Sequence, residues 1–116
     1  MALSSALVRE LLAQHAIGGS GLYEVIWDLN TREPSEPEVE KVRACIPVLS
    51  EFVGRGWVEL YRERWATQLE EPVQPESALQ AAADPRSWAA PSHAEPWYFC
   101  FVITEAGRLA HSQGLI

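Results

Sequence analysis

The sequence has little positive charge: nine Lys and Arg side chains stand against sixteen Asp and Glu, which gives a net charge of −7 at pH 7. Contacts to phosphate groups supply most of the non-specific affinity for nucleic acids and need a basic surface, so this balance disfavours DNA or RNA as the partner. An acidic protein is better matched to a basic protein.

The chain also lacks long apolar runs. No stretch approaches the ~20 apolar residues that a membrane helix needs, and no basic region at the N-terminus precedes an apolar block and a cleavage site. We therefore expect a cytoplasmic protein that does not enter the membrane. With 47% hydrophobic and 22% charged residues, the 116-residue chain has the composition of a single globular domain, 1–116.

Motifs for catalysis and metal binding are missing. Cys45 and Cys100 form no C-x-x-C pair, and His15, His93 and His111 have no Cys, Asp or Glu partner at a zinc-binding spacing. The chain contains no G-x-S-x-G sequence, which would mark a nucleophilic serine. We expect no enzymatic activity, no metal and no cofactor, and two free buried thiols in place of a disulfide.

Two helices are predicted before residue 35. In SSALVRELLAQHAIGG, Ser4 or Ser5 can cap a helix that Gly18 and Gly19 end. In SGLYEVIWDLN, four apolar residues fall at i, i+3, i+4 and i+7, the spacing of one buried helix face. They are Leu22, Val25, Ile26 and Leu29.

A third helix is predicted to begin at Ser35 and to stop at Gly54 or Gly56. Pro47 lies inside it, and a proline removes a helical hydrogen bond and clashes with the carbonyl four residues earlier. We therefore expect a split or a sharp bend near residues 43–46. The apolar positions predicted to face the core are Val39, Val42, Ile46, Leu49 and Val53.

Two strands are predicted, far apart in the sequence. Trp57–Trp65 alternates between two faces, and Trp97–Ile103 is apolar on both. Between them, residues 66–96 form a Pro- and Ala-rich insertion of net charge −4, with one short helix that Pro75 opens. An insertion of this length is typically functional or mobile.

LSEFVGRGWVELYRE resembles the end of a recognition helix that runs through a Gly-containing turn into the first strand of a wing. FVITEAGRL resembles the second wing strand entering the last helix, which Thr104 can cap and in which Gly107 allows a close backbone approach. Over residues 20–112, the chain is similar to bacterial winged helix-turn-helix proteins of the MarR and PadR type. The resemblance implies an α+β, winged-helix-like fold: three to five helices and a two-stranded antiparallel wing hairpin with a long acidic insertion.

The sequence departs from that pattern in three ways. The wing loop is longer and acidic, Pro47 stands where a recognition helix should run without interruption, and glutamates flank that helix. These glutamates are Glu36, Glu38, Glu40 and Glu51.

An aromatic surface rimmed by carboxylates is the leading candidate for a binding site, because Trp and Tyr are enriched at the energetic centres of protein interfaces. We expect a non-catalytic module that binds a basic protein, in the manner of an immunity protein, an antitoxin or an adaptor. Alternatively, the helix within residues 75–83 and Trp88 fold back over this surface and cover it. The predicted partner-binding residues are Trp57, Glu59, Tyr61, Glu63, Trp65 and Trp88.

The alternative function is a transcriptional regulator that binds DNA as a dimer. The N-terminal helix, Leu3–Ala16, would then pair across a two-fold axis, and cations of the third helix and the wing would contact DNA. The same cations could instead pair with neighbouring glutamates. The candidate DNA-binding residues are Lys41, Arg43, Arg55, Arg62 and Arg64.

Overall fold

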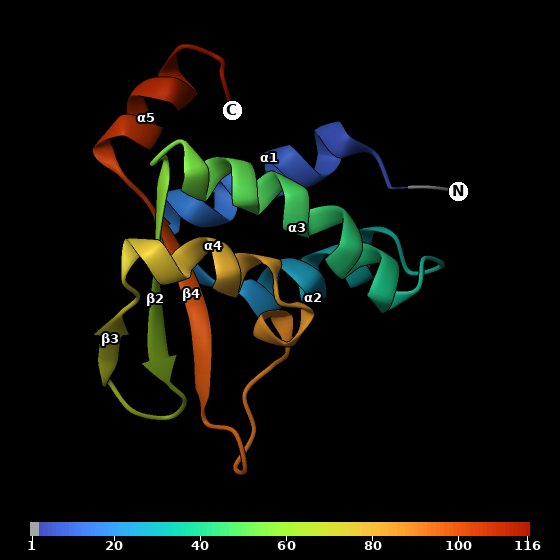
Figure 1. Ribbon diagram of the computed structural model, residues 1–116. Helices are drawn as coiled ribbons and strands as arrows, with labels where there is room; N and C mark the ends of the chain where they lie inside the picture. Colours follow the sequence, from blue (N-terminus) through green and yellow to red (C-terminus); the bar gives the residue numbers. More distant parts are fainter. Residues whose placement is uncertain (1–2) are drawn as a thin grey trace.

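The computed structural model describes residues 3–116, which form five α-helices, one 3-10 helix and four strands (Figure 1). The expected α+β class is confirmed. In chain order the elements are α1 (Ser5–Gly18), β1 (Ser20–Gly21), α2 (Leu22–Arg32), α3 (Glu38–Gly54), β2 (Val58–Arg64), β3 (Glu70–Pro72), α4 (Pro75–Ala83), η1 (Pro85–Trp88), β4 (Trp97–Ile103) and α5 (Glu105–Ser112).

β2 and β4 are the central pair of an antiparallel sheet with the order β1-β4-β2-β3. Val58 lies opposite Ile103 and Arg64 opposite Trp97, so the two predicted strands are neighbours, as expected. The sheet has two more strands than the expected two-stranded hairpin, because β1 pairs with β4 and β3 pairs with β2. Neither added strand has a sequence signal, since β1 has only two residues and β3 is Glu-Glu-Pro.

The helical layer covers one side of this sheet, and Figure 1 shows α4 crossing in front of β2 and β4, with α3 above it. α1 packs against α3 and β4, α4 packs along α3, and η1 contacts α2. Residues 66–96 therefore do more than connect β2 and β4. They add β3 to the sheet and return α4 and η1 to the helical layer.

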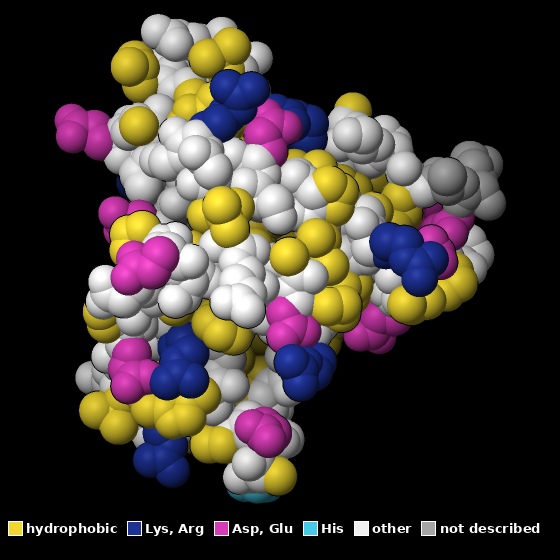
Figure 2. All heavy atoms as spheres, viewed as in Figure 1, with side chains coloured by type: hydrophobic (Ala, Val, Ile, Leu, Met, Phe, Trp, Pro, Cys, Tyr) yellow, Lys and Arg dark blue, Asp and Glu magenta, His cyan; other side chains and the backbone are white. Residues whose placement is uncertain are grey.

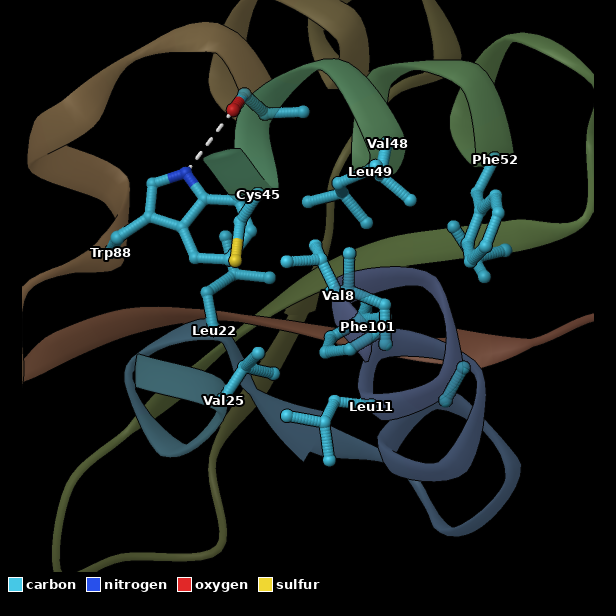
Figure 3. Packing of buried hydrophobic residues seen from close by; sticks show 14 of the residues in the cluster. Val8, Leu11, Leu22, Val25, Cys45, Val48, Leu49, Phe52, Trp88 and Phe101 are labelled. Atoms are coloured by element: carbon cyan, nitrogen blue, oxygen red, sulfur yellow. Dashed lines mark hydrogen bonds between the residues drawn. The ribbon is translucent and has the colours of Figure 1, made fainter. Parts of the chain in front are cut away.

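A single hydrophobic core lies between the helices and the sheet, with side chains from α1, α3 and β4 meeting at its centre (Figure 3). Trp88 closes one end of this core. The residue is 2% exposed, and its indole N–H donates a hydrogen bond to the carbonyl of Ala82 at 3.2 Å. The prediction of Trp88 as a partner-binding residue is wrong, because η1 turns the ring into the core, where α4 supplies the acceptor that a buried indole needs.

α3 is one uninterrupted helix of 17 residues that contains Pro47, so the expected split is wrong. Pro47 and Arg43 are both exposed, and water can therefore bond the Arg43 carbonyl that Pro47 leaves without a donor. The predicted core stripe is only partly right: Leu49 is buried, but Val39 is 60% exposed and the other three residues of the stripe are partly buried. The residues that α3 buries are Lys41, Cys45, Val48, Leu49 and Phe52.

The junction between the β2–β4 pair and α5 follows the prediction. Thr104 caps α5 by accepting a hydrogen bond from the Gly107 N–H at 3.0 Å, and its hydroxyl donates to the Gly56 carbonyl at 2.6 Å. A Cβ atom on Gly107 would lie 2.0 Å from the Trp57 carbonyl oxygen, so only glycine fits there. The four α2 residues predicted as a buried face are also buried.

Truncation of a core side chain should destabilise the protein. Leu49→Ala, Phe101→Ala and Trp88→Ala should each lower the free energy of unfolding by about 2 to 5 kcal/mol, because each leaves a cavity in the core. Urea unfolding followed by circular dichroism measures the change. Leu79→Ala is the control: Leu79 is 48% exposed, and its loss should cost less than ~1 kcal/mol. Core variants as stable as the parent would show that the core is misplaced.

Two Gly→Ala substitutions should act in opposite directions. Gly107→Ala should cost about 1 to 3 kcal/mol, because the new methyl group overlaps the Trp57 carbonyl. Gly54→Ala, in the last turn of α3, meets no atom within 4 Å and should stabilise the helix by up to ~1 kcal/mol. Thermal unfolding of the two variants tests the junction, and an equal effect of both would contradict it.

Candidate functional site

The register of β2 with β4 divides the sheet into two faces, since side chains alternate along a strand and directly paired residues share a face. One face carries buried core residues, including Leu60 and Phe101. The other face, named the open face, is mostly solvent-accessible; Cys100 and its β1 partner Gly21 are its buried positions among the described strands' residues. Its side chains are those of Glu59, Tyr61 and Glu63 from β2, Glu70 and Pro72 from β3, and Tyr98, Cys100 and Val102 from β4.

Glu63 lies near the end of β2, between Glu70 of β3 and Tyr98 of β4. Its carboxylate accepts a hydrogen bond of 2.6 Å from the Tyr98 hydroxyl and a weak one of 3.8 Å from the Cys100 thiol. The Tyr98 ring meets the edge of Tyr23 at a centroid distance of 5.2 Å, and Tyr23 meets Trp27 at 4.8 Å. A row of aromatic rings thus runs from the sheet onto α2 and ends at Trp27, which is 57% exposed.

The hydroxyl and thiol groups of this face are neutral at pH 7. Burial raises the pKa of Tyr61 to about 12, with further contributions from Cys100, Glu63 and Glu70. Burial and the Glu63 carboxylate raise the pKa of Cys100 to about 12. Burial and the hydrogen bond to Glu63 also raise the pKa of Tyr98. These groups remain hydrogen-bond donors, and the formal charge of the open face comes from its carboxylates.

No Lys or Arg belongs to the open face. The nine basic residues of the chain lie on the helices, in the turn after α3, or on the opposite face of β2. Arg62 is one of the latter: it binds Glu71 and lies over the Trp97 ring at 5.1 Å. The open face therefore combines aromatic surface with glutamates that have no cation among them.

Of the predicted partner-binding residues, the structure brings Glu59, Tyr61 and Glu63 together on the open face. It separates the tryptophans. Trp57 lies in the bend before β2 and packs against Phe52 at a ring distance of 5.8 Å. Trp65 follows β2, is 42% exposed and meets the His93 ring at 5.1 Å.

Sequence reasoning missed several members of the open face, because their grouping depends on register. Strand alternation puts Tyr98 and Cys100 on one side of their strand, but the sequence does not show that this side meets Glu63. Glu70 reaches the face through β3, which has no strand pattern. Tyr23 and Trp27 show the i, i+4 spacing of an aromatic pair, which was the one signal for their contact.

The candidate DNA-binding residues do not form one surface. Lys41 is 2% exposed and its Nζ donates a hydrogen bond to Asn30 at 2.8 Å, so it joins α3 to α2. Contrary to the prediction, its side chain is not available to DNA. Arg43 binds Glu40 at 2.8 Å, and Arg55 binds Glu51 at 3.2 Å. Arg62 and Arg64 lie on the core-side face of β2, Arg64 at its exposed end.

The exposed side of α3 is poor in positive charge. It presents Val39, Arg43, Pro47 and Gly54 to solvent, and α4 packs beside it. Figure 2 shows this side of the molecule, where the Lys and Arg side chains are scattered among hydrophobic ones and most lie next to an Asp or Glu. This helix offers one cation, Arg43, where a recognition helix needs several.

His15 has partners that its sequence spacing did not reveal. Its Nδ1 lies 2.9 Å from the Ser20 hydroxyl oxygen and its Nε2 lies 3.0 Å from a carboxylate oxygen of Asp28. Asp28 also accepts a hydrogen bond from Arg32 at 2.9 Å. These contacts join α1, β1 and α2.

The order Ser20, His15, Asp28 is that of a hydrolase triad, but the surroundings of the serine differ. Ser20 is 8% exposed, and its hydroxyl has two further acceptors, the Gly21 carbonyl at 3.0 Å and the Glu24 carboxylate at 3.2 Å. A carboxylate beside the serine opposes the negative charge that develops during acyl transfer. We interpret the cluster as a structural tie between the first two helices.

Within residues 3–116, no group of three or more His, Cys, Asp or Glu side chains is arranged to hold a metal ion. The same residues include no helix with the length and apolarity to cross a membrane. Cys45 and Cys100 are both free and buried, as expected.

No protein-family model, no curated protein and no solved structure matches this chain. The function is therefore inferred from the geometry and charge of the open face.

Asp28→Asn should remove part of the acid sensitivity of the fold. Burial raises the pKa of Asp28, but hydrogen bonds and charge from His15 and Arg32 outweigh it and hold the pKa below its ordinary value. A carboxyl with a lowered pKa in the folded state contributes stability that is complete above its unfolded pKa of about 4 and is lost as the pH falls through the folded pKa.

The melting temperature of Asp28→Asn should therefore be lower than that of the parent at neutral pH, and the two should converge as the pH falls to about 2. Differential scanning calorimetry across this range measures the difference. Glu10→Gln, which alters an exposed carboxyl of α1, is the control and should follow the parent at every pH. A constant gap between Asp28→Asn and the parent would contradict the ion-pair interpretation.

Proposed function

We propose that this protein is a non-catalytic binding module that docks a basic protein partner on the open face. The observation that carries the proposal is the composition of that face: tyrosine rings and glutamates with no Lys or Arg among them. Charge of one sign steers an oppositely charged partner and rejects a like-charged one. Immunity proteins, antitoxins and adaptors are the classes in which such a module acts without chemistry.

The aromatic members of the face supply the affinity that charge alone does not. Tyr61 and Tyr98 are half-buried, so their rings are held in place before a partner arrives. Rings of this kind bury large area at low entropic cost and are enriched among the residues that dominate binding energy. The hydrogen bond from Tyr98 to Glu63 holds one of these rings in position.

For the finer fold, we propose a winged-helix-like arrangement. It is supported by the order of the elements, in which three helices precede β2 and β4, the proposed wing strands. The side of α3 that α4 occupies would be unavailable to a DNA groove. In this arrangement the sheet face takes over the binding role that the third helix has in a regulator.

A DNA-binding dimer remains the alternative function, and the same order of elements supports it. Pairing through the N-terminal helix would have to use its exposed side, because the protein's own core already buries Val8, Leu11 and Leu12. Arg43, Arg55 and Arg64 are the candidates that stay exposed.

Neutralising the open face should weaken binding to a basic ligand. With an octa-lysine peptide as the probe, a triple Glu→Gln variant of the open face should bind about tenfold more weakly than the parent at low salt, and the difference should shrink as salt screens the charges. Isothermal titration calorimetry gives the affinities. The substitutions are Glu59→Gln, Glu63→Gln and Glu70→Gln.

A matched triple variant changes the same charge on the helical layer, away from the open face, and should bind the peptide nearly as the parent does. Its substitutions are Glu10→Gln, Glu38→Gln and Glu76→Gln. Equal losses in the two triple variants would reduce the effect to net charge and remove the open face as the site. Salt-sensitive retardation of a generic DNA duplex by the parent would favour the regulator instead.

A further inference from the structure

The open face contains a hollow of about 510 Å³ over β2, β3 and β4, beside the end of α1. Tyr61 and Val102 form its floor. Pro72 of β3 lies at one side and Gly19 lies at the other. Glu70 and Glu71 both line it. Glu70 is close enough to Tyr61 for its charge to raise the pKa of that hydroxyl, whereas Glu71 is already bound by Arg62. The hollow is thus apolar and aromatic below and carries a carboxylate above.

Gly19 keeps this hollow open. Its φ angle of 77° is one that residues with side chains rarely adopt, and a Cβ atom there would lie 3.6 Å from the Tyr61 hydroxyl and 3.7 Å from Val102. Any side chain at this position would fill the space beside the tyrosine.

The chemistry of the hollow specifies its occupant. An apolar floor suits the methylene groups of a long side chain, and a carboxylate at the rim suits a cationic end. A flat ring beside the carboxylate favours guanidinium over ammonium, because guanidinium stacks on aromatic faces and pairs with carboxylates in a planar geometry. No cation of this chain occupies the hollow: Arg62, the nearest in sequence, points to the other face of β2 and binds Glu71.

We propose that the hollow formed by Gly19, Tyr61, Pro72, Val102 and Glu70 receives an arginine side chain of the partner. This inference rests on the proposed function and specifies which side chain of the partner the open face binds. The arginine stacks on Tyr61 and its guanidinium pairs with Glu70, while the remaining glutamates of the open face interact with the partner's surrounding positive charge.

Two peptides of equal charge, octa-arginine and octa-lysine, distinguish binding in the hollow from general attraction to the charge of the open face. The full-length parent should bind octa-arginine about 2- to 5-fold more tightly than octa-lysine. Tyr61→Leu, which removes the ring but keeps an apolar floor, should bring this ratio to one. Tyr61→Phe, which keeps the ring and loses the hydroxyl, should preserve it.

Amide chemical shifts of the ¹⁵N-labelled parent locate the bound peptide. Octa-arginine should shift Gly19, Tyr61 and Val102 more strongly than octa-lysine does. A ratio unchanged by Tyr61→Leu, or equal shifts with the two peptides at these three residues, would overturn the arginine site.

The outcomes also separate this inference from the proposed function. If both peptides bind the open face with equal affinity and the open-face Glu→Gln variant weakens both, the proposed function stands and the arginine site fails. If neither peptide shifts the open face, both fail. Shifts confined to the helical layer would likewise reject both.

Discussion

The pairing of Leu60 with Phe101 across β2 and β4 is the contact on which the rest of the structure depends. Because side chains alternate along a strand, a slip of β2 by one residue would turn Leu60 out of the core and bring Glu59 and Glu63 into it. Two hydrogen bonds hold the register at its ends: Thr104 N–H to the Trp57 carbonyl at 2.9 Å, and Trp65 N–H to the Pro96 carbonyl at 2.8 Å. The register of β2 with β4 therefore determines both which residues form the core and which form the open face.

The long segment between the central strands completes this core. α3 leaves one side partly apolar, and α4 covers it with small side chains, Ala78 and Ala82, which are buried and allow the two helices to approach closely. Trp88 then fills the space between α4, α2 and β4. A segment with the prolines and charge of an insertion is part of the fold, because Trp88, Ala78 and Ala82 fall where the first three helices leave a gap.

Sequence reasoning reached the parts of the fold that local patterns determine. The stripe on α2, the cap at Thr104 and the extent of β4 follow from spacing and residue type. It failed where tertiary contacts decide. Pro47 does not break α3, because it lies on the exposed side, and β3 exists because β2 offers it a free edge. The open face was half predicted: Glu59, Tyr61 and Glu63 follow from alternation, whereas their neighbours on β3 and β4 follow from a register that the sequence does not encode locally.

The distribution of ion pairs supports the open face as the binding surface, because the unpaired carboxylates there lower the stability of the free protein. On the other surfaces most arginines have an acidic partner, so charge there is locally balanced. These pairs are Arg9–Glu51, Arg32–Asp28, Arg43–Glu40, Arg55–Glu51, Arg62–Glu71 and Arg86–Asp84. The glutamates of the open face have no such cation, and like charges held together destabilise a folded protein. A fold selected for stability alone would place an arginine among them, at little cost. On the proposed function, the partner supplies that missing charge, and an arginine in the hollow beside Tyr61 would relieve the repulsion that the free protein carries.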